Sequence, residues 1–204
     1  MKKIILASAS PRRREILRLT GLKFSVDAGD YDEDIESSLP PPALARFLSQ
    51  EKAQSVAGRH KHALIIAADT FIVFGGEILG KPHTEGEALR MLTALNGKSH
   101  TVITGFTILD TDTGKRISRS VKTRVWFNTL SPGEIKAYVG TGEPLDKAGG
   151  YAIQGLGALL VKKIEGDYFN VVGLPLNTVV ECLKKFGVHV LTEGTGAVTC
   201  TSRR

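Results

Sequence analysis

Residues 63–68 constrain the fold more than any other part of this sequence. They read Ala-Leu-Ile-Ile-Ala-Ala, form a continuous apolar run and are followed directly by Asp69-Thr70. A short apolar run that stops at polar residues is typical of a strand buried on both faces, as in a sheet covered by helices. Asp69 would then end the strand at the carboxyl edge of the sheet, where open α/β folds place ligand crevices.

The segments on either side alternate between strand and helix patterns. Strands are predicted at residues 3–7, 24–28 and 63–68 and helices at residues 12–19, 43–57 and 85–95, with a hairpin over residues 71–79 that turns at Gly75-Gly76. Ser131-Pro132-Gly133-Glu134 has capping-box spacing and predicts a helix through Val139. The thirty residues after Asn96-Gly97 are predicted to form strands, with a turn at residues 112–114. A glycine-rich loop and strand are predicted at residues 140–157, and a last helix after Pro175. We therefore expect an α/β domain with a mixed sheet and flanking helices, pinched into two lobes by a cleft.

Composition limits the classes of function. The chain has 204 residues, of which 42% are hydrophobic, which suffices for one buried domain. It has 27 basic and 21 acidic residues and a net charge of +6, which suits an anionic ligand. Aromatic residues make up only 6% and do not interleave with a basic stripe, so nucleic acid is not an expected partner.

The cysteines and the apolar segments indicate the compartment. Cys182 and Cys200 are too few and too far apart for a disulfide framework or a clustered metal site, which favours reduced thiols in the cytosol. The sequence has neither a signal-peptide core nor an apolar stretch long enough for a membrane helix. We expect a cytoplasmic protein with a folded domain over residues 1–188 and a disordered tail over residues 189–204, which is rich in Thr and Gly.

Several familiar motifs fail on spacing. Gly97-Lys98-Ser99 ends like a phosphate-binding loop, but the first glycine of that motif would fall on Leu92. The five histidines contain no HExxH arrangement. P-loop and zinc-peptidase chemistry are therefore not expected.

Three arginines occupy the first turn of the first predicted helix. Ser10 suits the N-cap, Pro11 the first helical position, and Arg12, Arg13 and Arg14 follow directly. Cations are disfavoured at a helix N-terminus, unless a polyanion binds there to the amides and the arginines. Ser8 and Ser10 would add donors for phosphate oxygens. The alternative is that the arginines point into water at small cost.

The other candidate residues each give only weak evidence of a functional site when taken individually. Asp69 could bind a metal or accept a proton from water, although a turn or cap role is commoner for a single aspartate. Lys52 shares the inner stripe of its helix and needs a partner there, unless its stem covers apolar surface and its ammonium reaches water. Lys81 lies in a rigid Gly-Lys-Pro turn. The glycine-rich segment around Lys147 and Gln154 could close around a ligand.

Together these segments resemble the Maf family of nucleotide pyrophosphatases from about Lys3 to Val188. The matching motifs are Ser8-Ala9-Ser10-Pro11-Arg12-Arg13, Ala68-Asp69-Thr70, Gly80-Lys81-Pro82, Gly142-Glu143-Pro144 with Asp146-Lys147-Ala148-Gly149, and Asn170-Val171-Val172-Gly173-Leu174-Pro175. The resemblance implies an elongated two-lobed fold related to inosine triphosphatase, commonly a homodimer. It also implies hydrolysis of a nucleoside triphosphate between the α and β phosphates.

The resemblance also implies roles for individual residues. Asp69 falls on the general base, and Arg12, Thr70 and Gln154 fall on specificity positions of the branch that prefers dTTP and UTP. The implied cofactor is a divalent cation, Mg²⁺ or Mn²⁺, with Asp69 and Glu33 as candidate ligands. The implied cleft also contains Lys52 and Lys81, and it closes with the segment that runs from Lys147. Two alternatives stay open: a pyrophosphatase for modified nucleotides, and a non-catalytic nucleic-acid or cell-division partner.

Overall fold

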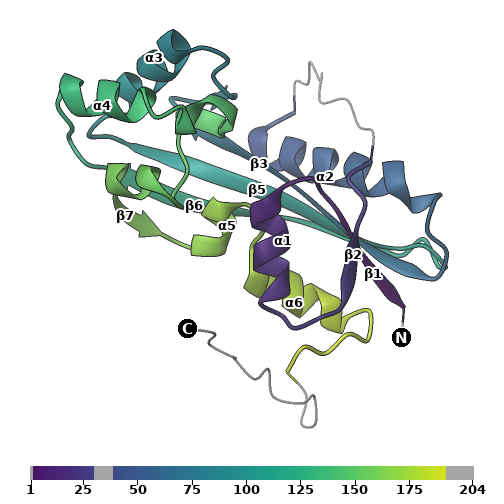
Figure 1. The fold of residues 1–204 in the computed structure, drawn as a ribbon. Helices are drawn as coiled ribbons and strands as arrows, with labels where there is room; N and C mark the ends of the chain where they lie inside the picture. The colour runs from purple at the N-terminus through teal and green to yellow at the C-terminus, as the bar shows by residue number, and fades with distance from the viewer. Residues whose placement is uncertain (1, 30–38, 192–204) are drawn as a thin grey trace, which may run out of the picture.

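The structure is a computed structural model that describes residues 2–29 and 39–191 (Figure 1). In chain order its elements are β1 (Lys3–Ala7), α1 (Pro11–Arg18), β2 (Phe24–Val26), α2 (Pro41–Ala57), β3 (Ala63–Phe74), β4 (Glu77–Leu79), α3 (Glu85–Leu95), β5 (Ser99–Asp110), β6 (Arg116–Phe127), α4 (Pro132–Val139), three 3-10 helices η1 (Glu143–Asp146), η2 (Ala148–Gly150) and η3 (Leu156–Leu160), β7 (Val161–Glu165), α5 (Tyr168–Val172) and α6 (Leu176–Lys184). The predicted α/β class with a mixed sheet and flanking helices is confirmed.

The seven strands in the described ranges belong to one sheet of order β2-β1-β3-β5-β6-β7, in which β4 also pairs with β3. β1 runs parallel to β2 and β3, whereas the remaining pairs are antiparallel. β5 pairs with one edge of β3 along almost its whole length. The other edge of β3 pairs with β1 up to Ala67 and with β4 from Ile72. Among the described residues, positions 68–71 therefore have no strand neighbour on that edge, and the sheet has a gap there.

The prediction that Asp69 ends its strand is wrong. β3 continues from the apolar run to Phe74, and Asp69 pairs with Gly105 in the middle of the ladder to β5. The residues after Asp69 are mainly β-branched or aromatic, and β5 supplies a continuous partner, so a single polar position does not stop the strand. The carboxyl end beside Asp69 belongs to β1, which stops at Ala7.

Helices cover both faces of the long strands. Even-numbered residues of β3 and β5 lie on one face of the sheet. Ile66 and Phe106 on this face pack against α1, α5 and α6. Farther along the same strands, Ile72 and Val102 pack against α3 and α4. The opposite face packs against α2. Figure 1 shows α3 and α4 together near one end of the long strands and α1 with α6 in a separate group. The core is thus divided between two helix groups on one face.

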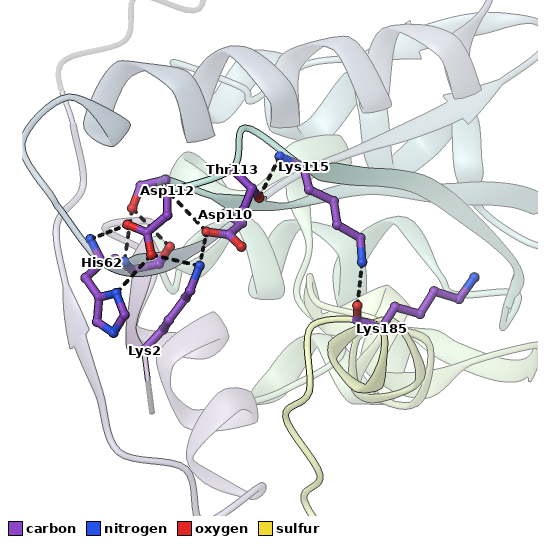
Figure 2. Close-up of polar contacts among 9 residues, drawn as sticks. Lys2, His62, Asp110, Asp112, Thr113, Lys115 and Lys185 are labelled. Atoms are coloured by element: carbon purple, nitrogen blue, oxygen red, sulfur yellow. Dashed lines mark hydrogen bonds and ion pairs between the residues drawn. The ribbon is translucent and has the colours of Figure 1, made fainter.

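Polar contacts fix the turn between β5 and β6 to two other parts of the chain (Figure 2). Lys2 Nζ lies 2.5 Å from Asp110 Oδ1 and 2.9 Å from Asp112 Oδ2, and the hydrogen bond from Lys2 is the main cause of the lowered pKa of Asp112. Lys115 Nζ donates to the carbonyl oxygen of Lys185 at 2.6 Å, next to the end of α6. The predicted turn is confirmed, and its side chains connect the start of β1 to the end of α6.

Local sequence patterns also predicted several caps and turns. Ser10 caps α1, Ser131 and Glu134 form a capping box, and the hairpin turns at Gly75-Gly76. Within residues 140–157 the predicted strand is wrong: the segment contains the short 3-10 helices η1 and η2 and the start of η3, which are joined by turns and loop. Within the described ranges, no helix is long and apolar enough to cross a membrane. Most of the predicted disordered tail, residues 192–204, lies outside the described residues.

Candidate functional site

A cavity of about 1090 Å³ opens at the gap in the edge of β3. Its walls come from the loop between β1 and α1, from α2, β3 and α5, and from the segments around Gly80 and Ala148. Nine of the predicted site residues line it: Ser8, Ser10, Arg12, Arg13, Lys52, Asp69, Thr70, Lys81 and Lys147. The fold thus brings together residues that are up to 139 positions apart in the chain.

The remaining two predicted site residues are Gln154 and Glu33. Gln154 follows Ile153, which does line the cavity, but Gln154 itself does not. Glu33 lies outside the described residues. Sequence reasoning also missed lining residues such as His83 and Tyr151, which have no motif of their own.

The loop between β1 and α1 places the start of α1 at the cavity. Ser10 Oγ accepts the backbone N–H of Arg13 at 3.4 Å and so caps α1. Ser8 Oγ accepts the backbone N–H of Ser10 at 3.2 Å, which tightens the loop after β1. The first-turn amides of α1 and its positive dipole end therefore belong to the same wall as the arginines.

Arg13 joins three separate segments of the chain. Its Nε donates to the carbonyl oxygen of Gly173 at 2.9 Å, Nη1 to Ser8 Oγ at 3.3 Å and Nη2 to Thr70 Oγ1 at 3.1 Å. The alternative that the arginines point into water is therefore wrong for Arg13. The planar guanidinium group of Arg13 thus links the loop before α1 to β3 and to the residue after α5.

Arg12 extends the positive charge toward α4. Burial and then the Glu143 carboxylate raise the pKa of the Tyr138 hydroxyl, whereas the charge of Arg12 lowers it. Arg12 is thus within electrostatic reach of Tyr138 on α4. Tyr138 donates to Glu143 Oε1 at 3.0 Å, and the same carboxylate accepts the backbone N–H groups of Leu156 and Gly157 at 3.1 and 2.9 Å. Glu143 therefore holds the turn that contains Gln154.

Lys52 of α2 and Asp69 of β3 form an ion pair. Their side chains are only 12% and 13% exposed, and Lys52 Nζ donates directly to Asp69 Oδ1. Asp69 points to the α2 side of the sheet because odd positions of β3 face α2. The prediction that Lys52 needs a partner on the inner side of its helix is confirmed.

Thr70 lies on the opposite side of the sheet. Its Oγ1 lies 2.9 Å from Thr104 Oγ1 of β5, and Thr104 donates to the carbonyl oxygen of Asn170 at 2.9 Å. Thr104 and Asn170 are fully buried. No sequence pattern indicated this connection, since isolated threonines in strands are ordinary.

The charges that line the cavity are strongly unbalanced. Among its described lining residues, five are cationic and one, Asp69, is a carboxylate. The cations are Arg12, Arg13, Lys52, Lys81 and Lys147. No group of three or more His, Cys, Asp or Glu side chains suited to a metal occurs in the described part of the chain. This wall suits a polyanion that brings its own negative charge.

The model of the family described as Maf-like protein matches residues 3–186. This chain belongs to the Maf family. It is similar to the dTTP/UTP pyrophosphatase of Methanosarcina barkeri (strain Fusaro / DSM 804), with 51% identity over 95% of this chain and 99% of that protein. It is also similar to the dTTP/UTP pyrophosphatase of Moorella thermoacetica (strain ATCC 39073 / JCM 9320), with 51% identity over 93% of this chain and 98% of that protein. The predicted membership in the Maf family is thus confirmed.

A solved structure gives a weaker match to this Maf family chain. It is a nucleoside-triphosphatase / dITP/XTP pyrophosphatase from Mycobacterium abscessus, aligned over 63% of this chain and 75% of its own with a TM-score of 0.38 and 11% identity. A match at this level supports no argument about the fold or the function of the Maf family protein.

Proposed function

We propose that this Maf family protein is a nucleoside triphosphate pyrophosphatase that hydrolyses dTTP and UTP to the nucleoside monophosphate and pyrophosphate. The observation that carries the proposal is the convergence of five cationic side chains around the carboxylate of Asp69 in one cavity. The dTTP/UTP pyrophosphatases that are 51% identical over nearly the whole chain support the same activity.

The cations suit the triphosphate and its leaving group. Hydrolysis of the anhydride between the α and β phosphates places additional negative charge on the departing pyrophosphate. Fixed cations stabilise such charge because they require no reorganisation during the reaction. In the proposal, Arg13, Ser8, Ser10 and the first amides of α1 bind phosphate oxygens, while Lys81 and Lys147 approach from the facing wall.

Asp69 is the proposed catalytic residue. It is the one carboxylate among the described lining residues, and it lies at the gap in the sheet edge, where water and substrate can reach it. The proposed role is to accept a proton from the attacking water, with Lys52 holding the carboxylate in position.

The residues fit a divalent cation that binds together with the nucleotide. Mg²⁺ is commonly held by one or two carboxylates, several waters and substrate phosphates, and Asp69 offers one such carboxylate. When bound, Mg²⁺ or Mn²⁺ would supply charge neutralisation and lower the pKa of a bound water. Glu33 is proposed as the second carboxylate.

Arg12, Thr70 and Gln154 are the proposed specificity residues. Arg12 and Thr70 line the cavity, and Gln154 lies in the turn that Glu143 holds through Leu156 and Gly157. We also propose that the chain forms a cytoplasmic homodimer, with residues 1–188 as the catalytic domain and residues 189–204 as a tail. The match of residues 3–186 to the family supports this division, and light scattering after gel filtration would test the dimer.

A substrate panel tests the proposed activity. Purified protein would be assayed for pyrophosphate release from dTTP, UTP, CTP, dATP, GTP and 7-methyl-GTP, and from modified uridine and cytidine triphosphates, with Mg²⁺ or Mn²⁺. We expect the highest kcat/KM for dTTP and UTP, and the loss of turnover with retained nucleotide binding in Asp69→Asn. Absence of pyrophosphate from both dTTP and UTP would sink the proposal. Faster hydrolysis of a modified nucleotide would reassign the substrate.

A further inference from the structure

Thr70 is hydrogen-bonded to Thr104, which is in turn hydrogen-bonded to the carbonyl oxygen of Asn170. That carbonyl oxygen determines which group donates in each of these bonds. Thr104 Oγ1 lies 2.9 Å from the carbonyl oxygen of Asn170, and Thr104 is 0% exposed. A hydroxyl has a single hydrogen, and a carbonyl oxygen can only accept. Thr104 therefore donates its hydrogen to Asn170.

This direction determines what Thr104 can offer to Thr70. With its hydrogen used, Thr104 can only accept, so the 2.9 Å contact between the two hydroxyls has Thr70 as its donor. The other acceptor near Thr70 is the carbonyl oxygen of Gly173 at 3.4 Å, which would also take the hydrogen away from a ligand. Arg13 Nη2 donates to Thr70 Oγ1 at 3.1 Å. Thr70 keeps one lone pair for a ligand and has no hydrogen left to donate.

We propose that Thr104 is a positioning residue that makes Thr70 an obligate hydrogen-bond acceptor, so that the cavity selects a pyrimidine base whose N3 carries a hydrogen and donates it to Thr70. This inference rests on the proposed function and names the atom that the specificity position recognises. Phosphate oxygens at neutral pH only accept and gain nothing from such a partner. Thr70 therefore faces the nucleoside part of the substrate.

The base edges of the pyrimidines differ at this kind of contact. N3 of uracil and thymine carries a hydrogen and donates, whereas N3 of cytosine accepts. A cytosine N3 opposite Thr70 would place two lone pairs against each other, or would draw the Thr70 hydrogen away from buried Thr104. A ribose hydroxyl could rotate to suit either state of Thr70 and would not discriminate between bases. The fixed chain therefore favours dTTP and UTP over CTP.

The variant Thr104→Val tests this inference because it keeps the side-chain shape and removes the hydroxyl. Thr70 then loses its buried acceptor at 2.9 Å and keeps only the carbonyl oxygen of Gly173 at 3.4 Å, so its hydrogen is held more weakly and can turn toward the ligand. We expect the ratio of kcat/KM for UTP to that for CTP to fall about tenfold, or roughly 1.4 kcal/mol, the size of one net hydrogen bond. Thr104→Ser restores the hydroxyl and is expected to restore the ratio.

Thr107→Val is the matched control. Thr107 lies on the same strand, is equally buried and bonds to the hydroxyls of Ser49 and Ser118 at 2.8 Å. It faces α2, and neither of these hydroxyl partners lines the cavity, whereas the Thr70 partner of Thr104 does. Its loss is expected to lower stability by a similar amount and to leave the UTP-to-CTP ratio unchanged. A change of ratio in Thr107→Val equal to that in Thr104→Val would assign the effect to general destabilisation and overturn the inference.

The outcomes separate this inference from the proposed function. Lack of UTP hydrolysis by the wild-type protein contradicts the proposed function itself. UTP hydrolysis with an unaltered ratio in a Thr104→Val protein that unfolds cooperatively contradicts only the role of Thr104. If Thr104→Val does not fold, the wild-type protein is assayed with N3-methyl-UTP, which lacks the N3 hydrogen. At least a tenfold loss relative to UTP is expected, and equal hydrolysis of the two would overturn the inference.

Discussion

Lys52 of α2 donates to the carboxylate of Asp69 across the face of the sheet opposite to Thr70. Both side chains are nearly buried, so the charge of Asp69 is stabilised by this adjacent cation. The pair fixes the orientation of the proposed catalytic carboxylate at the gap between β1 and β4. Asp69 and Thr70 are consecutive residues of β3, and they line the same cavity from opposite faces of the sheet.

Lys52→Gln is expected to lower kcat about 100-fold, because Asp69 loses both its positioning partner and a nearby cation. The free energy of unfolding should fall by about 2 kcal/mol, since a largely buried carboxylate is left without its ion pair. Steady-state kinetics and urea unfolding measure the two effects. The control is Lys184→Gln, which breaks the exposed pair between Lys184 and Glu181 and should change stability by less than about 0.5 kcal/mol. Equal effects of the two substitutions would show that the Asp69 pair has no special role.

Gly105→Ala is expected to prevent α2 from docking on the sheet. A Cβ at Gly105 would lie 2.0 Å from the carbonyl oxygen of Ala45, which is backbone and cannot turn aside. A loss of more than about 3 kcal/mol in the free energy of unfolding, or an insoluble protein, is the expected result. Gly58→Ala is the control, because a Cβ there meets nothing within 4 Å and Gly58 has a helical φ of −64°. Similar denaturation midpoints for both variants would refute this account of α2 packing.

Glu143→Ala should loosen the turn that contains Gln154. The carboxylate of Glu143 accepts from the backbone N–H groups of Leu156 and Gly157 and from the hydroxyl of Tyr138. We expect a loss of about 2 kcal/mol in the free energy of unfolding and a KM for UTP raised about tenfold, because these donors lose a charged acceptor. Glu77→Ala, on exposed β4, serves as the control. An unchanged KM in Glu143→Ala would separate this turn from substrate binding.

His100 should make the stability of the protein depend on pH. Burial lowers the pKa of His100 from 6.5 to about 4, and its Nε2 lies 2.7 Å from the buried hydroxyl of Tyr151. Between these two pKa values the unfolded chain binds more protons than the folded protein, so stability falls as pH falls. The contribution of His100 is fully present above about pH 6.5 and should decrease by about 2 kcal/mol between about pH 7 and pH 5.

His100→Gln removes this titration and should give a correspondingly flatter dependence of stability on pH. Urea unfolding at a series of pH values measures the slope in both proteins. His62→Gln is the control, since the His62 side chain is 68% exposed. The assignment to His100 fails if His100→Gln keeps the wild-type slope.

Local patterns in the sequence predicted much of the fold because short-range forces produce it. The cap at Ser10, the capping box at Ser131 and the turn at Gly75-Gly76 depend on neighbouring residues alone, and the structure confirms them. Two elements were not predicted correctly, for different reasons. β3 passes through Asp69 because β5 pairs with it, and α5 was not predicted because five residues are too few to show helical periodicity.

The sequence by itself determined the α/β class, the Maf resemblance and most of the candidate residues, since residue type and order are enough for a motif. Only the tertiary structure decided how those residues meet. The gap in the edge of β3 depends on where β1 ends and β4 begins, and the pairing of Lys52 with Asp69 depends on how α2 lies on the sheet. The hydrogen-bond direction from Thr70 through Thr104 to Asn170 joins three elements that are distant in the chain. Such relations arise from sheet register and helix packing, which local sequence patterns do not encode.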